Sequence, residues 1–591
     1  PPPPPPPSLP KQKPPTENVP STTPVAPSPS AAAPSPPVVA EVKIDAKPSL
    51  RVRRLSINPI SFMIPQPPWK PDTEVSSDFA RHKDVLMARG AGVGEAAAYF
   101  RGLTCANSTP VFAMCEGSNA SVVKALLDLV AAPTGSYPDS VQVDALWSLA
   151  NICAGSHTDA VFISDLSAVD IFLKLLSRSV PADFDPETSP PPPNAASPLL
   201  QELSLLALGN LAGSRDRDNS TLPIAAEIID YDGIRIVTRV LKAALHRYIA
   251  AAGSSTGGSG GGELAAAATN PHLGLLRSSM WCLCNLARQR STKETLDVIP
   301  LLTTLLLKVG DIECLAAACQ VLDWLAEEPE NVLHLRGCLE VLPKLVLWTR
   351  EVNSCLCTPS LRTLGALCTG FSGELGLGSV DYCQEVVSSG GVEAMLSFLK
   401  KSRARGDVEQ QREALFALSN VAGASNLAVK ALLDEGVFYD VLDLLRESKE
   451  ETIRMECLYV IANPWAPAVG VDTEVSKQLL KEGLLQELSG MCDPNVSVRL
   501  LRLVLTGLQD GLKKGQQLMM WVAKAHETAE AFAQSQGLPL PPPPANLSVN
   551  NVAQLYKELG TVAKIQALNG HEDEETRTKA NGLAMQFKFL V

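Results

Sequence analysis

The residues in this sequence with the most evident chemistry are aromatic side chains followed four positions later by asparagine. Residues four apart share one face of a helix. An asparagine amide offers a donor and an acceptor to the backbone of an extended peptide. Parallel aromatic rings leave slots for the aliphatic stems of Lys or Arg, with a cation–π attraction of ~0.5–2 kcal/mol each. Four such pairs occur in apolar, helix-period runs: Trp147/Asn151, Trp281/Asn285, Phe416/Asn420 and Tyr459/Asn463.

Carboxylates accompany two of these pairs. Glu413 and Glu456 each precede their aromatic by three residues, so they share its helical face. A single helical Trp is more often core, and a single helical Asn is often a cap or a surface residue. Repetition of the pair at one register favours instead a ladder of rings and amides that faces a shared trough. Such a ladder selects spaced Lys or Arg residues and performs no covalent chemistry, so we expect no enzyme.

Helical repeats must position this ladder. The chain has 591 residues, of which 45% are hydrophobic, which is too long for one core. The later copies of the aromatic-containing segment recur at intervals near the HEAT/armadillo period, and small residues such as Ala154-Gly155-Ser156 follow each copy. Stacked units of this kind bury one continuous core and form a concave surface. We therefore predict an all-α, armadillo-repeat, right-handed superhelical solenoid of about ten repeats.

The composition changes along the chain and predicts three parts. Residues 1–73 are rich in Pro, Ala, Ser and Val, and we expect a disordered arm with a short basic cluster. Residues 74–545 form the solenoid, with loop insertions near 180–198 and 250–270. Residues 546–591 form a C-terminal repeat or cap.

The net charge and the spacing of the cysteines limit which kinds of partner and ligand we expect. The net charge of −12 argues against direct binding of nucleic acid and suits a cationic partner. The 14 cysteines lack zinc-ligand spacing, and the isolated histidines form no metal cluster, so we expect buried free thiols, no metal and no cofactor. No apolar run reaches the ~18 residues of a membrane span, so no membrane is expected as a partner.

The repeat segments resemble importin-α, in order, from about residue 74 to 591. Residues 140–176, with Ala145-Leu-Trp-Ser-Leu-Ala-Asn151, resemble its second armadillo repeat. Later segments resemble the third to the eighth repeats, and Ala563-Lys-Ile-Gln-Ala-Leu-Asn-Gly-His571 is similar to the last. The resemblance implies a nuclear import adaptor that binds Lys/Arg-rich nuclear localisation signals as extended peptides in a Trp/Asn-lined groove.

The resemblance also implies two peptide sites. The matching positions of the major site are Trp147, Asn151, Gly155, Asn210, Trp281 and Asn285, with Gly155 in the pocket for the key lysine. Those of the minor site are Arg362, Glu413, Phe416, Asn420, Glu456, Tyr459 and Asn463.

Further partners follow from the same resemblance. The family hands its cargo to importin-β through a basic N-terminal segment that also folds back as a self-inhibitor. Lys47, Arg51, Arg53 and Arg54 form either a remnant of that segment or a solvated charge cluster. The last repeat of the family helps to bind an export receptor. The chain is accordingly expected to shuttle between cytoplasm and nucleus.

Several residues depart from the family pattern and keep a second function open. Leu206 replaces the Trp of the third repeat, and Ser214 replaces the Asp that pairs the key lysine. Ala366 replaces the Asn of the sixth repeat, and Gln320 the Trp of the fifth. The alternative is an armadillo scaffold for cytoskeletal or signalling partners that has lost the import role.

Overall fold

The computed structural model describes most of the chain beyond its N-terminal arm. The described residues are 77–105, 114, 120–186, 188–190, 192–214, 223–254, 270–288, 293–327, 329–351, 355–369, 382–544 and 550–590. Segment 1–73, with Lys47, Arg51, Arg53 and Arg54, lies outside them. Within the described ranges every regular element is a helix, which confirms the prediction of an all-α architecture.

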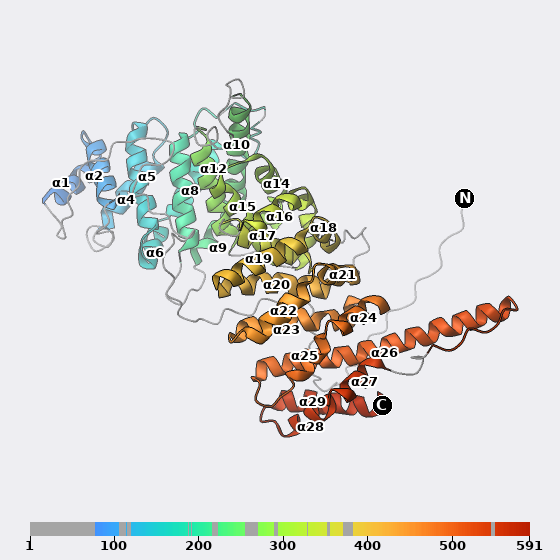
Figure 1. Ribbon diagram of the computed structural model, residues 1–591. Coiled ribbons are helices and arrows are strands. Elements are labelled where there is room, and N and C mark those ends of the chain that lie inside the picture. Colours follow the sequence, from blue (N-terminus) through green and yellow to red (C-terminus); the bar gives the residue numbers. More distant parts are fainter. Residues whose placement is uncertain are drawn as a thin grey trace, which may run out of the picture.

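A series of inner helices runs through the molecule, and each packs on the next from the blue end of the chain to the red end (Figure 1). Ten such helices lie in the described residues, in agreement with about ten repeats. They are α2 (Val93–Cys105), α5 (Asp139–Cys153), α8 (Pro198–Gly213), α12 (Leu273–Ala287), α15 (Ile312–Glu327), α17 (Cys357–Leu367), α20 (Val408–Ala424), α23 (Glu451–Ala462), α26 (Val498–Ser535) and α29 (Glu574–Leu590).

A second set of helices packs beside the inner series, one in each unit. These are α1 (Ser77–Ala88), α4 (Ala120–Ala131), α7 (Ala168–Ser179), α10 (Gly233–Ser254), α14 (Ile299–Lys308), α16 (Leu342–Arg350), α19 (Gly391–Arg405), α22 (Val437–Glu447), α25 (Leu484–Gly490) and α28 (Thr561–Ala567).

Shorter helices lead into most units. The α-helices are α6 (His157–Asp165), α9 (Pro223–Asp230), α13 (Lys293–Leu296), α18 (Tyr382–Ser388), α21 (Asn426–Asp434), α24 (Thr473–Lys481) and α27 (Asn551–Glu558). The 3-10 helices are η2 (Pro329–Val341), η3 (Asn463–Trp465), η4 (Pro467–Val469) and η5 (Leu568–Gly570).

A left-handed residue recurs where the first helix of a unit turns into the second. Gly436 precedes α22 with φ +70°, and Gly483 precedes α25 with φ +81°. Glycine takes this conformation without a Cβ penalty. Ser167 and Asp232, each with φ 63°, hold the same place before α7 and α10. These positions differ from the small-residue breaks seen in the sequence, such as Ala154-Gly155-Ser156, which follow an inner helix and lead into the next unit.

The buried side chains form one cluster that extends from Phe79 to Phe587. Close helix contacts hold it together. A Cβ on Gly365 of α17 would lie 2.8 Å from Cα of Ala417 on α20, so these two backbones approach within the space that glycine leaves. Stacking of neighbouring units therefore supplies the hydrophobic core, as expected for a repeat protein.

The insertions lie between helices. Described residues from Val180 to Ser197 join α7 to α8 without a helix. The second insertion begins later than expected, because α10 continues to Ser254, and residues 255–269 lie outside the described part. No described helix combines the length and apolar composition that a bilayer span requires.

Candidate peptide-binding surface

The tryptophans of the N-terminal half lie between helices. We expected Trp147 and Trp281 to line an open trough, but they are only 1% and 2% exposed. The Trp281 ring packs on the backbone of α8, where a Cβ on Gly209 would lie 2.4 Å from a ring carbon. This ring fills the gap between α8 and α12, so it does not present an open plate.

An internal arginine lies over the other tryptophan. The Arg101 guanidinium sits 5.6 Å from the centroid of the Trp147 ring and pairs with Asp144 at 2.8 Å. Burial raises the pKa of Asp144, and the charge of Arg101 opposes this shift. The cation beside the Trp147 ring thus belongs to the protein itself.

The asparagines of the ladder connect neighbouring units. Asn151 donates from Nδ2 toward Sγ of Cys105 on α2, at 3.6 Å, and is 1% exposed. The other four donate from Nδ2 to a carbonyl of the preceding inner helix in the series. These bonds are Asn210 to Ala150 at 3.0 Å, Asn285 to Gly209 at 3.2 Å, Asn420 to Gly365 at 3.3 Å and Asn463 to Ser419 at 2.8 Å.

The asparagine amides thus act as ties between repeats. The asparagines occupy the same position in each repeat, as the sequence pattern predicted. Their side-chain NH₂ groups, however, point toward the neighbouring repeat. The amides of Asn210 and Asn420 each give a second donor to a helix carbonyl, since Ala150 also accepts from the Ala154 amide and Gly365 from the Cys368 amide, and a hydrogen bond of this kind contributes about 0.5–1.5 kcal/mol. The expectation that Asn151 and Asn285 face an open trough is corrected by this geometry.

Gly155 follows α5 at an exposed turn. A Cβ there would lie 2.7 Å from Oδ2 of Asp159, so the absence of a side chain makes room for that carboxylate. Asp159 accepts from the Ser156 amide at 2.8 Å and from its hydroxyl at 2.7 Å, which caps α6. The carboxylate nearest to the predicted lysine pocket is therefore engaged in a capping box.

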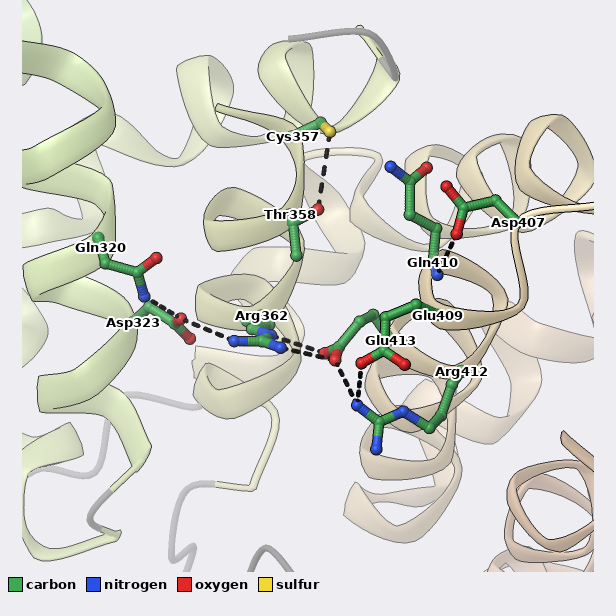
Figure 2. Close-up of polar contacts among 10 residues, drawn as sticks. All are labelled: Gln320, Asp323, Cys357, Thr358, Arg362, Asp407, Glu409, Gln410, Arg412 and Glu413. Carbon is green, nitrogen blue, oxygen red and sulfur yellow. Dashed lines mark hydrogen bonds and ion pairs between the residues drawn. The ribbon is translucent and has the colours of Figure 1, made fainter. Parts of the chain in front are cut away.

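The C-terminal half carries a chain of polar contacts across three inner helices (Figure 2). Gln320 donates to Asp323 on α15 at 2.8 Å. Arg362 on α17 lies 3.7 Å from Asp323 and donates twice to Glu413 on α20, at 2.6 Å from both Nε and Nη2. The structure thus joins two residues predicted for the minor site, Arg362 and Glu413, which are 51 positions apart.

Arg412 extends this chain on α20. It lies 3.1 Å from Glu413 and also pairs with Glu409 (Figure 2). Sequence reasoning missed Arg412 and Asp323. Arg412 could have been found from its spacing of three residues from Glu409. Asp323 gave no comparable signal, because its contact with Arg362 depends on the packing of separate units.

Glu456 on α23 is a carboxyl with a strongly perturbed environment. Burial raises the pKa of Glu456 to about 7; the Arg412 charge lowers it and the Glu413 charge raises it. Among the described residues, no hydrogen bond or ion pair to the Glu456 carboxylate was found. A desolvated carboxyl without a paired cation gains from the arrival of one.

Two half-buried aromatic rings belong to the same pair of packed helices, α20 and α23. Phe416 lies one turn after Glu413 on α20, and Tyr459 lies one turn after Glu456 on α23. Burial and the nearby Glu456 raise the pKa of the Tyr459 hydroxyl. The rings of this half, unlike Trp147 and Trp281, thus remain partly accessible. We call Arg412, Glu413, Phe416, Glu456 and Tyr459 the α20–α23 surface.

Comparison with known proteins supports the resemblance at low identity. No family model matches the chain. Importin subunit alpha-1b and alpha-1a of Oryza sativa subsp. japonica are 25% and 24% identical over 40% and 50% of this chain. Importin subunit alpha-4 of Arabidopsis thaliana is 23% identical over 54% of it. The matched parts span 35%, 45% and 52% of the lengths of these three relatives.

Solved structures share the fold. A crystallised engineered protein superposes with a TM-score of 0.58 at 19% identity and covers 87% of this chain and 99% of its own. A structure from a study of the phosphorylation switch between cadherin and β-catenin superposes with a TM-score of 0.52 at 15% identity, covering 86% and 91%. Together with the stack of helical units, these likenesses show an armadillo-repeat fold and support the resemblance of the chain to importin-α.

Proposed function

We propose that this chain is an armadillo adaptor that binds a Lys/Arg-rich extended peptide on the α20–α23 surface. The observation that carries the proposal is the desolvated Glu456 carboxyl on a pair of packed helices that also carry two partly accessible rings. A peptide Lys or Arg placed there gains an ion pair and a π face together. The surface performs no covalent step in this proposal.

The charges around the surface suit a cationic ligand. When all groups are ionised, the four carboxylates Asp323, Glu409, Glu413 and Glu456 exceed the two guanidiniums Arg362 and Arg412. Arg362 and Arg412 pair with three of these carboxylates, so one negative charge remains in that group and a second lies at Glu456. The net charge of −12 for the chain acts in the same direction at longer range.

Within this proposal the ligand is a nuclear localisation signal. The similarity to importin subunits alpha supports that choice, since those relatives are named as importin subunits. Transfer to importin-β by the basic cluster at Lys47 to Arg54, binding of an export receptor by the last repeat (α27 to α29), and shuttling between cytoplasm and nucleus complete the proposed import role.

A second function is favoured by the N-terminal half. There the rings are covered and Arg101 already lies over Trp147. An adaptor that needs two peptide sites loses one in this arrangement. A scaffold that binds cytoskeletal or signalling partners by other surfaces does not depend on it.

The test is a fluorescence-anisotropy titration of the full chain with a labelled Lys/Arg-rich signal peptide and a scrambled acidic peptide. We expect Glu456→Gln and Tyr459→Ala each to weaken binding of the basic peptide about tenfold or more. The matched control, Glu435→Gln, removes an exposed carboxylate at the end of α21 and should leave the affinity unchanged.

Two outcomes separate the candidates. Loss of affinity in both variants with the control intact supports peptide binding on the α20–α23 surface. Equal affinity of wild type for basic and acidic peptides, or no binding to either, would rule out the adaptor and favour the scaffold.

A further inference from the structure

The last part of α26 is more exposed than any other inner helix. The first half of this 38-residue helix packs against α23 and α29. Its second half projects beyond the stack, and the following segment runs back along it (Figure 1). Met520, Trp521 and Phe532 on this half are 61%, 65% and 63% exposed. Large aromatic side chains left in water on one helix face indicate a surface that another element covers.

The exposed residues form one stripe. Trp521, Ala525, Thr528 and Phe532 are all exposed and follow spacings of four, three and four residues, which keeps them on one face of the helix. Ala533, in contrast, is buried, and its carbonyl accepts from the Leu538 amide at 2.9 Å. The chain therefore covers one side of the projecting helix and leaves the other side open.

The stripe is self-complementary. Its spacings read the same in both directions, so an antiparallel second copy places Trp521 of one helix opposite Phe532 of the other, and Ala525 opposite Thr528. Large residues then meet at the ends, and small residues allow close approach in the middle. Two copies related by a twofold axis meet in this isologous way.

The charges beside the stripe fit the same pairing. Lys524 and Glu527 are exposed and lie on one flank, three positions apart and on either side of the midpoint of the stripe. In an antiparallel pair, residues of the same flank face each other, so Lys524 of each copy comes next to Glu527 of its partner. This half of the helix extends beyond the rest of the stack (Figure 1), so it is accessible to a second copy.

We propose that the projecting half of α26 mediates self-association, in which two copies of the chain pair these helices antiparallel through Trp521 and Phe532. The contact is small, so the dimer forms with a dissociation constant on the order of micromolar. It is separate from the α20–α23 surface and does not depend on the proposed peptide binding.

Sedimentation velocity of the full chain from about 1 to 100 µM tests the pairing, with circular dichroism to verify that each variant is folded. Wild type should shift from monomer to dimer over this range. Lys524→Glu and Glu527→Lys should each weaken the dimer about tenfold or more, because two attractive pairs become repulsive. An equimolar mixture of these two variants restores both attractive pairs and should dimerise as wild type does.

Two further variants complete the experiment. Trp521→Ala with Phe532→Ala should abolish the dimer, and Lys449→Glu, the same charge change on the exposed α22–α23 connection, should leave it unchanged. A monomer at every concentration overturns the proposal. So does a dimer that survives removal of both rings, or a charge-variant mixture that fails to recover.

Discussion

At the scale of single residues, Glu456 differs from the other carboxyls of the polar chain. Asp323 and Glu413 face Arg362 directly, so their charges are neutralised within the protein. Glu456 is desolvated and lies beside Glu413, a like charge, which explains its raised pKa. In the proposed function this carboxyl binds a cation of the peptide, because a nearby positive charge offsets both penalties.

Binding at Glu456 should therefore depend on pH. The pKa of free Glu456 is raised to about 7, and a bound peptide cation lowers it, so binding releases a proton. Affinity for the basic peptide should rise as pH increases from about 6 to 8 and then level off. Glu456→Gln should remove most of this rise. Anisotropy titrations at several pH values measure it, and a wild-type affinity that is flat across this range contradicts the assignment.

Folding stability should respond in the opposite sense. The pKa of Glu456 is higher in the folded chain than the ordinary 4.5 of an unfolded one, so the folded state binds more protons. The stabilising effect of this proton is present at low pH and is lost as pH rises from about 4.5 through 7. Peptide affinity and stability thus change in opposite directions where the two intervals overlap, from about pH 6 to 7, which distinguishes titration of Glu456 from a general effect of pH.

Asn285 should act on stability and leave the α20–α23 surface unaffected. Asn285→Ala removes the donor to the Gly209 carbonyl, so the free energy of unfolding should fall by about 0.5–1.5 kcal/mol in urea titrations. Asn495→Ala, at an exposed position, is the control and should change it by less than about 0.5 kcal/mol. If Asn285→Ala weakens peptide binding at unchanged stability, its amide contacts the peptide and the tie between repeats is a secondary role.

At the scale of elements, the residue that precedes the second helix of a unit has a left-handed backbone in several units, and this conformation limits which amino acids fit there. Gly436 occupies it without strain, whereas Ser167 carries a Cβ at φ 63°. A non-glycine residue in this region costs roughly 1–2 kcal/mol, offset in part by the greater entropy that glycine loses on folding.

Exchange of these residues should have opposite effects. Ser167→Gly should raise the free energy of unfolding by about 0.5–1 kcal/mol, and Gly436→Ala should lower it by about 1 kcal/mol. Chemical denaturation followed by circular dichroism measures both changes. Destabilisation by Ser167→Gly would mean that the serine side chain stabilises the start of α7 by more than the strain of its backbone.

The same elements show what the sequence could predict. Apolar spacing and small-residue breaks predict the helices and their repetition, because both are local properties. The direction of Trp147 is not local, since residues four apart share a face whether that face meets a neighbour or solvent. Arg101, which covers its ring, lies on another helix. Glu413 and Arg362 were assigned to one site only through the resemblance, and their contact depends on the packing of α17 against α20.

At the scale of the whole molecule, the two halves of the stack differ in what their inner helices present. Asparagine amides join units in both halves, but the N-terminal half also packs its rings between units, whereas the C-terminal half keeps a charged, partly aromatic surface. The same fold thus has buried aromatic rings in one half and partly exposed rings in the other. This division favours a single peptide per chain, while the projecting part of α26 offers a way to bring two such surfaces together.

The proposed import role also requires binding of importin-β, for which the stack of helices alone is not sufficient. The chain carries a net charge of −12, so its basic cluster is opposite in sign to the rest of the molecule. We expect importin-β to bind the full chain and to lose that binding when Lys47, Arg51, Arg53 and Arg54 are all changed to Ala, because their charges provide the attraction. Calorimetric titration with importin-β measures this, and raised salt should weaken the wild-type interaction. Undiminished binding by the fourfold variant would place the contact elsewhere, and no binding by wild type would exclude the import role and leave the scaffold.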